Sequence, residues 1–244
     1  MVTEGVNRAL RYSLRAMTSL SAVLFDFNGV LVDDEHLHQS GFNDVLAPLG
    51  VTMTDEAYRE RYLGFDDRGA FTAVLRDFGR EPDESLVRDL IARKAEVYLR
   101  RALTELRIYP GAASVVRAAA ATTLVGIVSG ALRSEIDLAL GVMNARDAVR
   151  FIVAAEDVAA CKPDPEGYLA GLAHARNERA IAAARSVVAI EDSIAGIESA
   201  RAAGLSVIAV AHTYERSALE KAGAHEVVAT IAEVTVERLV ALAS

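Results

Sequence analysis

The sequence predicts an α/β protein whose core is a doubly wound parallel sheet, with an all-helical domain inserted into it. The first observation is that short apolar runs alternate with longer stretches of helical periodicity. The runs are apolar throughout, as strands covered on both faces should be, and they span residues 22–27, 124–128, 151–153, 187–190 and 207–210. The helical patterns span residues 112–121, 134–142, 166–175 and 194–203. Such alternation predicts right-handed crossovers and a parallel sheet.

The second observation is a segment without any strand pattern, which interrupts this alternation between residues 34 and 107. It has helical periodicity punctuated by glycines, and Thr54 followed by Asp55 and Glu56 is typical of a helix N-terminus. We therefore expect an α/β core of residues 21–33 and 108–244 and a helical cap domain of residues 34–107. Residues 1–20 are expected to be an N-terminal extension outside the core, either disordered or a surface helix.

Composition and charge exclude several classes of function. The chain has 244 residues and a formal net charge of −8, without a run of Lys or Arg that could neutralise nucleic-acid phosphates. Its longest uncharged run, residues 118–132, is shorter than the ~20 residues that a membrane-spanning helix needs. Cys161 is the single cysteine, so no internal disulfide can form. We expect a cytoplasmic monomer or weak homodimer that binds neither nucleic acid nor membrane.

Reactive side chains lie near the ends of the predicted strands, where α/β sheets bind their ligands. They are Asp26, Ser129, Lys162, Glu191 and Asp192. Each alone is typical of a turn or a helix cap. Together, the carboxylates suit Mg²⁺, and the hydroxyl and the ammonium can hold the oxygens of a phosphoryl group. A carboxylate can also act as a nucleophile and form an acyl-phosphate, so the set indicates a phosphoryl-transfer site with Mg²⁺ as cofactor.

In order, residues 26–30, Ser129, Lys162 and residues 191–192 resemble the four signature motifs of the haloacid dehalogenase-like superfamily. The resemblance covers residues 22–244, and the helical insert after the first motif is similar to the beta-phosphoglucomutase and phosphoglycolate phosphatase-like branch. It implies a Rossmann-like core and a phosphoric monoester hydrolase. In such an enzyme Asp26 would carry an aspartyl-phosphate, and the substrate would be a small phosphorylated metabolite.

The resemblance also implies a role for individual residues. The metal ligands would be Asp26, Asn28 through its main-chain carbonyl, Glu191 and Asp192, and the catalytic residues Asp26, Asn28, Ser129 and Lys162. Residues 63–68 resemble the substrate-facing loop of the cap, and Lys94 falls where such caps carry a phosphate-contacting lysine. The expected substrate-binding residues are Gly64, Arg68, Lys94, Gly130 and His38.

Asn28 departs from the family pattern, in which this position is a second aspartate that acts as general acid and base. A carboxamide cannot exchange a proton at neutral pH, and general acid–base catalysis contributes typically ~10²–10⁴-fold, or roughly 3–5 kcal/mol. Three explanations remain open. Another group could substitute, and Glu35, His36 and His38 lie just downstream. Alternatively, the substrate has a good leaving group, or the chain binds a phosphorylated ligand with little turnover.

Other activities agree less well with the sequence. The dehalogenase branch needs no Mg²⁺, which would leave Glu191 and Asp192 without a role. A phosphonatase needs a lysine that forms an imine, and the only lysine between the first two motifs is Lys94. Ser129 lacks the glycine two residues earlier that a serine hydrolase elbow requires. The alternatives kept are a catalytically weak phosphate-binding or regulatory protein and a phosphomutase of the same family.

Overall fold

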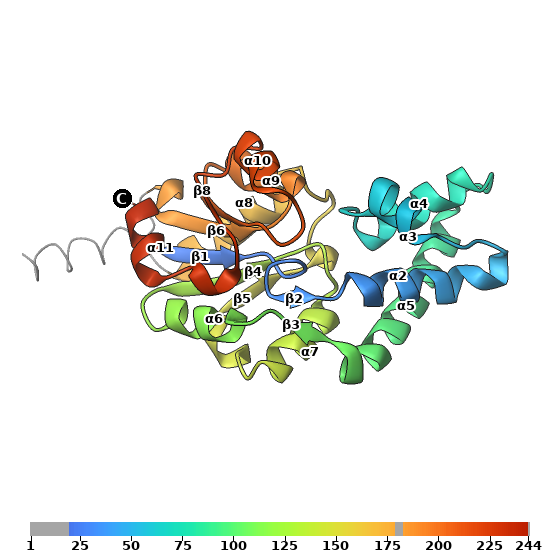
Figure 1. Ribbon diagram of the computed structural model, residues 1–244, viewed down its shortest axis with the longest axis horizontal. Helices are drawn as coiled ribbons and strands as arrows, with labels where there is room; N and C mark the ends of the chain where they lie inside the picture. Colours follow the sequence, from blue (N-terminus) through green and yellow to red (C-terminus); the bar gives the residue numbers. More distant parts are fainter. Residues whose placement is uncertain (1–19, 179–182, 244) are drawn as a thin grey trace, which may run out of the picture.

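A computed structural model describes residues 20–178 and 183–243, and the expected extension at residues 1–19 lies outside these described residues. Its centre is a six-stranded parallel sheet (Figure 1) with the order β5-β4-β1-β6-β7-β8. The strands are β1 (Ala22–Phe25), β4 (Leu124–Val128), β5 (Phe151–Val153), β6 (Val187–Glu191), β7 (Ser206–Val210) and β8 (Glu226–Val228). The predicted parallel α/β sheet is confirmed.

Two layers of helices cover the sheet because its strands are apolar on both faces. One face packs against α6 (Ala112–Ala120), α7 (Arg133–Val142) and α11 (Val236–Leu242). The other packs against α8 (Glu166–Glu178), α9 (Ile194–Ala202) and α10 (Arg216–Lys221). Alternate residues of β1 point to opposite faces of the sheet. Val23 and Phe25 belong to the hydrophobic core on the first face, and Leu24 belongs to the core on the second.

The chain order of the strands reverses beside β1, which has β4 on one side and β6 on the other. Phe25 pairs in register with Ile127 of β4 and with Ile190 of β6. The three strands therefore end at the same level, and the residues that follow them meet in the crevice at the switch point.

Six helical segments between β2 (Val32–Asp33) and β3 (Arg107–Ile108) form a separate layer beside the carboxyl edge of the sheet (Figure 1). They are α2 (Glu35–Leu46), the 3-10 helix η1 (Ala47–Leu49), α3 (Asp55–Ala57), the π-helix η2 (Tyr58–Tyr62), α4 (Asp67–Asp77) and α5 (Glu84–Glu105). The two short strands pair antiparallel at the base of this insert. The helices have a hydrophobic cluster of their own, which includes Phe42, Phe71 and Leu90.

Several element boundaries differ from those expected. The first strand ends at Phe25, because the chain turns at Gly29 with a φ of +72° and Leu31 donates its amide to the carbonyl of Phe27. Strand β8 has no counterpart in the prediction, since three residues are too few for a pattern. Leu20, expected in the extension, is buried in the core. Among the described residues, no helix combines the length and hydropathy needed to cross a membrane.

The insert depends on its own small core, and this can be tested at Phe71. Phe71 is fully buried and packs edge-on against Phe42, with ring centroids 4.8 Å apart. We expect Phe71→Ala to lower the free energy of unfolding by roughly 3–5 kcal/mol, measured by urea denaturation. The matched control is Phe78→Ala, because Phe78 is 49% exposed on the same helical layer. Equal losses in the two variants would contradict this packing.

Candidate active site

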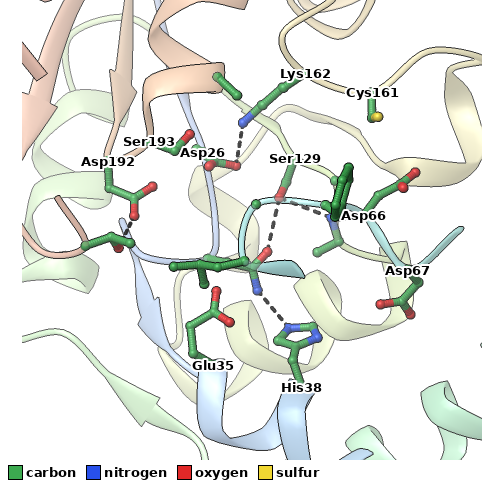
Figure 2. A pocket seen from close by; sticks show the side chains of 18 of the residues that line it. Asp26, Glu35, His38, Asp66, Asp67, Ser129, Cys161, Lys162, Asp192 and Ser193 are labelled. Carbon is green, nitrogen blue, oxygen red and sulfur yellow. Dashed lines mark hydrogen bonds and ion pairs between the residues drawn. The ribbon is translucent and has the colours of Figure 1, made fainter. Parts of the chain in front are cut away.

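Three buried carboxylates meet where β1 and β6 end. Asp26 directly follows β1, Glu191 is the last residue of β6, and Asp192 follows it. Each offers an oxygen, and these oxygens all lie within 4.8 Å of one another. Figure 2 shows Asp26 and Asp192 facing the same space, with Lys162 beside Asp26.

Lys162 is the cation that faces this cluster. Its Nζ lies 2.9 Å from Oδ1 of Asp26 and 2.6 Å from Oε1 of Glu191. Burial alone would lower the pKa of Lys162, but the charges of Asp26 and Glu191 raise it above its ordinary value. The ammonium therefore stays charged and is held between the two carboxylates.

Glu191 has hydrogen-bond partners on both of its oxygens. Oε1 accepts from Lys162 and, at 2.7 Å, from the hydroxyl of Tyr168. Oε2 accepts from the hydroxyl of Ser193 at 3.1 Å. A Cβ at Gly196 would lie 2.0 Å from this carboxyl group, so the first turn of α9 must be glycine there to leave room. These contacts fix Glu191 so that it orients Lys162.

The three carboxylates of this cluster carry more negative charge than the ammonium of Lys162 can offset. Burial and the charge of Glu191 raise the pKa of Asp26 to about 6, and the same two causes raise the pKa of Asp192 well above its usual range. Such a set of hard oxygen donors, buried and short of positive charge, fits a divalent cation. The structure thus supports the expected metal site in its donor chemistry.

Two residues near this site were not predicted from the sequence. Thr213 donates its hydroxyl to Oδ2 of Asp192, and Nδ1 of His212 lies 2.8 Å from the carbonyl oxygen of Gly29. Both follow β7, whose end lies next to that of β6. The available signal was their position after an apolar run, at the edge where the other reactive residues gather. A Cβ at Gly29 would lie 1.9 Å from Asp192, so only glycine allows this approach.

The two polar atoms of the Asn28 side chain have different partners: Nδ2 points toward Asp34, and Oδ1 points toward Ser129. Its Nδ2 donates to Asp34 at 3.1 and 2.9 Å, while its Oδ1 accepts from the hydroxyl of Ser129 at 3.5 Å. Nε2 of His38 is 3.1 Å from the same amide nitrogen. The predicted residues Asn28, Ser129 and His38 are thus brought together.

His38 has a contact at each ring nitrogen. Nδ1 lies 2.6 Å from Nζ of Lys94, and Nε2 lies 3.3 Å from Asp34. Burial and Lys94 would lower the pKa of His38, but Asp34 and Glu135 raise it to about 9. Neither nitrogen is free to contact a substrate directly.

Lys94 is fully buried between the insert and the core. Its Nζ donates to Asp67 of α4 at 2.6 Å and lies 3.7 Å from Glu135 of α7. Burial would lower the pKa of Lys94, whereas Glu135 and Asp67 raise it overall. The ammonium thus neutralises carboxylates on both sides of the boundary between insert and core.

The cavity above the carboxylates is lined by residues of both the insert and the core. Of the predicted substrate-binding residues, Gly64, Gly130 and His38 line it, whereas Arg68 is exposed outside it and Lys94 lies behind its wall. The part of the lining away from Asp26 is acidic, with Glu35, Asp66, Asp67 and Glu135. In the described part of the chain, Lys162 is the only Lys or Arg in the lining. Figure 2 shows Glu35 and the pair at 66–67 around this space.

Comparison with known proteins agrees with this geometry. Residues 23–210 match the family described as haloacid dehalogenase-like hydrolase. CbbY of Cereibacter sphaeroides is 30% identical over 226 residues, covering 88% of this chain and 94% of that protein. Phosphoglycolate phosphatase of Rhodospirillum rubrum is 28% identical over 211 residues, covering 83% and 84%. A crystal structure of a CbbY variant from Rhodobacter sphaeroides, in complex with xylulose-(1,5)bisphosphate, superposes with a TM-score of 0.78 at 28% identity, covering 90% and 99%.

The chain belongs to the haloacid dehalogenase-like hydrolases, so the resemblance of its four motifs is confirmed. Similarity to CbbY and to a phosphoglycolate phosphatase also confirms the predicted branch of that family. The family match and the phosphatases among its relatives support a phosphatase hydrolase.

The burial of Lys94 predicts a structural cost when its charge is removed. We expect Lys94→Met to lower the free energy of unfolding by roughly 3–5 kcal/mol, because Asp67 and Glu135 would be left without a cation. Adding Glu135→Gln should recover part of the loss. Arg93→Met is the matched control, since Arg93 is the exposed neighbour on α5. Denaturation curves in which the two single variants coincide would rule out this role.

Proposed function

We propose that the protein is a Mg²⁺-dependent phosphatase that hydrolyses a small phosphorylated metabolite through an aspartyl-phosphate on Asp26. The observation that carries this proposal is the cluster of Asp26, Glu191 and Asp192 around Lys162, at the crevice of an α/β sheet. Asp26 is the member of the cluster that follows the central strand, which places its carboxylate at the switch point.

Asp26, Asp192 and the main-chain carbonyl of Asn28 would hold the cation. Glu191 adds negative charge nearby, but its oxygens are engaged by Lys162, Tyr168 and Ser193. When bound, Mg²⁺ supplies charge that keeps the carboxylates ionised and neutralises the phosphate oxygens.

Ionised Asp26 attacks phosphorus, and the bond from phosphorus to the leaving oxygen breaks as the new bond forms. Ser129 and Lys162 bind the non-bridging oxygens as their charge redistributes. Water then attacks the phosphorus of the aspartyl-phosphate, which frees inorganic phosphate and returns Asp26 as a carboxylate. The ammonium of Lys162 lies 2.9 Å from Asp26, so it can steady this carboxylate through both steps.

Proton transfer is the weak part of this site. Asn28 can accept a hydrogen bond from water through Oδ1 but cannot take its proton. Of the three substitutes considered, His38 has both ring nitrogens engaged and His36 does not line the cavity. Glu35 does line it and uses one carboxylate oxygen to accept from Tyr58 at 2.6 Å. We therefore propose that substrates with leaving groups of low pKa react fastest, with Glu35 as the available base.

The acidic far end of the cavity favours a particular kind of substrate. A second phosphate or a carboxylate there would face Glu35 and Asp66, which have no cationic partner in the described lining. Asp67 and Glu135 are offset by Lys94, which is buried behind the wall and already paired with them. Hydroxyl and ammonium groups can instead donate to these oxygens. We propose a phosphate monoester of a neutral or amine-bearing carbohydrate-like molecule. A phosphate-binding protein with little turnover is the second candidate, and Asn28 is the observation that favours it.

Phosphate release from a panel of monoesters and acyl phosphates tests the proposal. We expect release that requires Mg²⁺, stops in EDTA, and falls by roughly 10³-fold or more in Asp26→Asn, because the nucleophile is lost. Rates should rise as the pKa of the leaving group falls. Neutral or amino sugar phosphates should exceed bisphosphates and carboxylate-bearing esters of matched leaving group.

The controls separate the two candidates. Asp157→Asn, an exposed acid that pairs with Arg133, should leave the rates unchanged. If no ester or acyl phosphate is hydrolysed while Mg²⁺ and a phosphate analogue still bind, the hydrolase proposal is wrong and the binding protein replaces it.

A further inference from the structure

We infer that Asp34 is a positioning residue for Asn28, and that the two side chains are a matched pair in which one must donate a hydrogen bond and the other must accept it. A consequence is that proton transfer at position 28 can be restored by exchanging both residues, but not by Asn28→Asp alone. The structural part stands on the contacts of the pair, and its catalytic part rests on the proposed function.

The contacts fix which way the amide of Asn28 points. Both oxygens of Asp34 lie within hydrogen-bond distance of Nδ2, at 3.1 and 2.9 Å. A carboxylate only accepts hydrogen bonds, so the amide nitrogen must face it. The opposite rotamer would bring the carbonyl oxygen against two acceptors. Asp34 therefore keeps Oδ1 of Asn28 on the side of Ser129, where the phosphoryl group would lie.

Asp34 does not have the usual role of an aspartate in its position. It immediately precedes α2, where Asp commonly accepts a hydrogen bond from a helix N–H, but its side chain makes no such bond. The carboxylate is instead fully buried and turned inward. Besides Asn28, it accepts from the hydroxyl of Tyr98 at 2.5 Å and lies 3.3 Å from Nε2 of His38.

This burial requires donors on every side, because an ionised carboxylate away from water is costly unless it is hydrogen-bonded. Asn28 comes from the core, whereas His38 and Tyr98 come from α2 and α5 of the insert. The carboxylate thus binds groups from both parts of the fold. The orientation of the active-site amide is thereby tied to the position of the insert.

A carboxylate at position 28 would lose this arrangement. Its oxygen in place of Nδ2 would lie about as far from Asp34 as that nitrogen does, 2.9 to 3.1 Å. Two acceptor oxygens would then face each other in a buried site without a hydrogen atom between them. With Asn at position 34, the same geometry is satisfied in reverse, because the new amide donates to the new carboxylate and its carbonyl oxygen accepts from Tyr98.

The test is a double-mutant cycle with Asn28→Asp, Asp34→Asn and the combined variant. We expect Asn28→Asp to lower Tm by roughly 5–10 °C and the combined variant to recover most of that loss. Asp33→Asn combined with Asn28→Asp is the matched control, since Asp33 is the half-exposed neighbour and should give no recovery. If Asn28→Asp does not fold at all, folding of the combined variant is the same rescue.

The rate of hydrolysis is a second measurement, which would not change if Asp34 had a purely structural role. Against substrates with poor leaving groups, the combined variant should exceed the unmodified protein by at least ~10-fold and depend less on leaving-group pKa. Asn28→Asp alone should not. A wild-type Tm for Asn28→Asp, or equal rescue by Asp33→Asn, overturns the pairing. Coupled stabilities in proteins that all fail to release phosphate would support the pairing and overturn the proposed function.

Discussion

The rest of the site depends on the ion pairs that the ammonium of Lys162 forms with Asp26 and Glu191. The ammonium lies between Asp26 and Glu191 at the end of two adjacent parallel strands, in a place where the carboxylates are almost completely removed from water. Without a cation, such a cluster would be strongly repulsive. Lys162 reduces the repulsion, and the raised pKa values of Asp26 and Asp192 show the charge that is still uncompensated. A divalent cation would offset the remaining negative charge.

A second buried network joins the insert to the core. Lys94 binds Asp67 within the insert and approaches Glu135 on α7, while Asp34 binds side chains from both parts. His38 links Lys94 to Asp34. Buried groups of this kind are costly unless every partner is present, so the network specifies one arrangement of the insert over the cavity. Substrate enclosure and the orientation of Asn28 are consequences of that same arrangement.

Much of the fold could be predicted from the sequence because buried parallel strands are apolar runs, and because reactive residues after them must converge. The positions of Asp26, Ser129 and Glu191 at the ends of such runs predict that they converge. Side-chain partners across long separations carried no such signal. Nothing in the sequence around Asp34 distinguishes an inward-facing carboxylate from a helix cap, and burial of Lys94 depends on packing between α5 and α7. The expectation that Arg68 binds substrate came from a loop resemblance, whereas the structure has this residue exposed outside the cavity.

The most direct test of the account is to locate the phosphoryl group on the protein. The enzyme would be quenched during turnover of a reactive acyl phosphate with Mg²⁺, reduced with borohydride to mark the acyl-phosphate, and mapped by peptide mass spectrometry. The account predicts a mark on Asp26 that disappears with EDTA and in Asp26→Asn. Phosphate release without any mark on Asp26, or a mark on another residue, would contradict it.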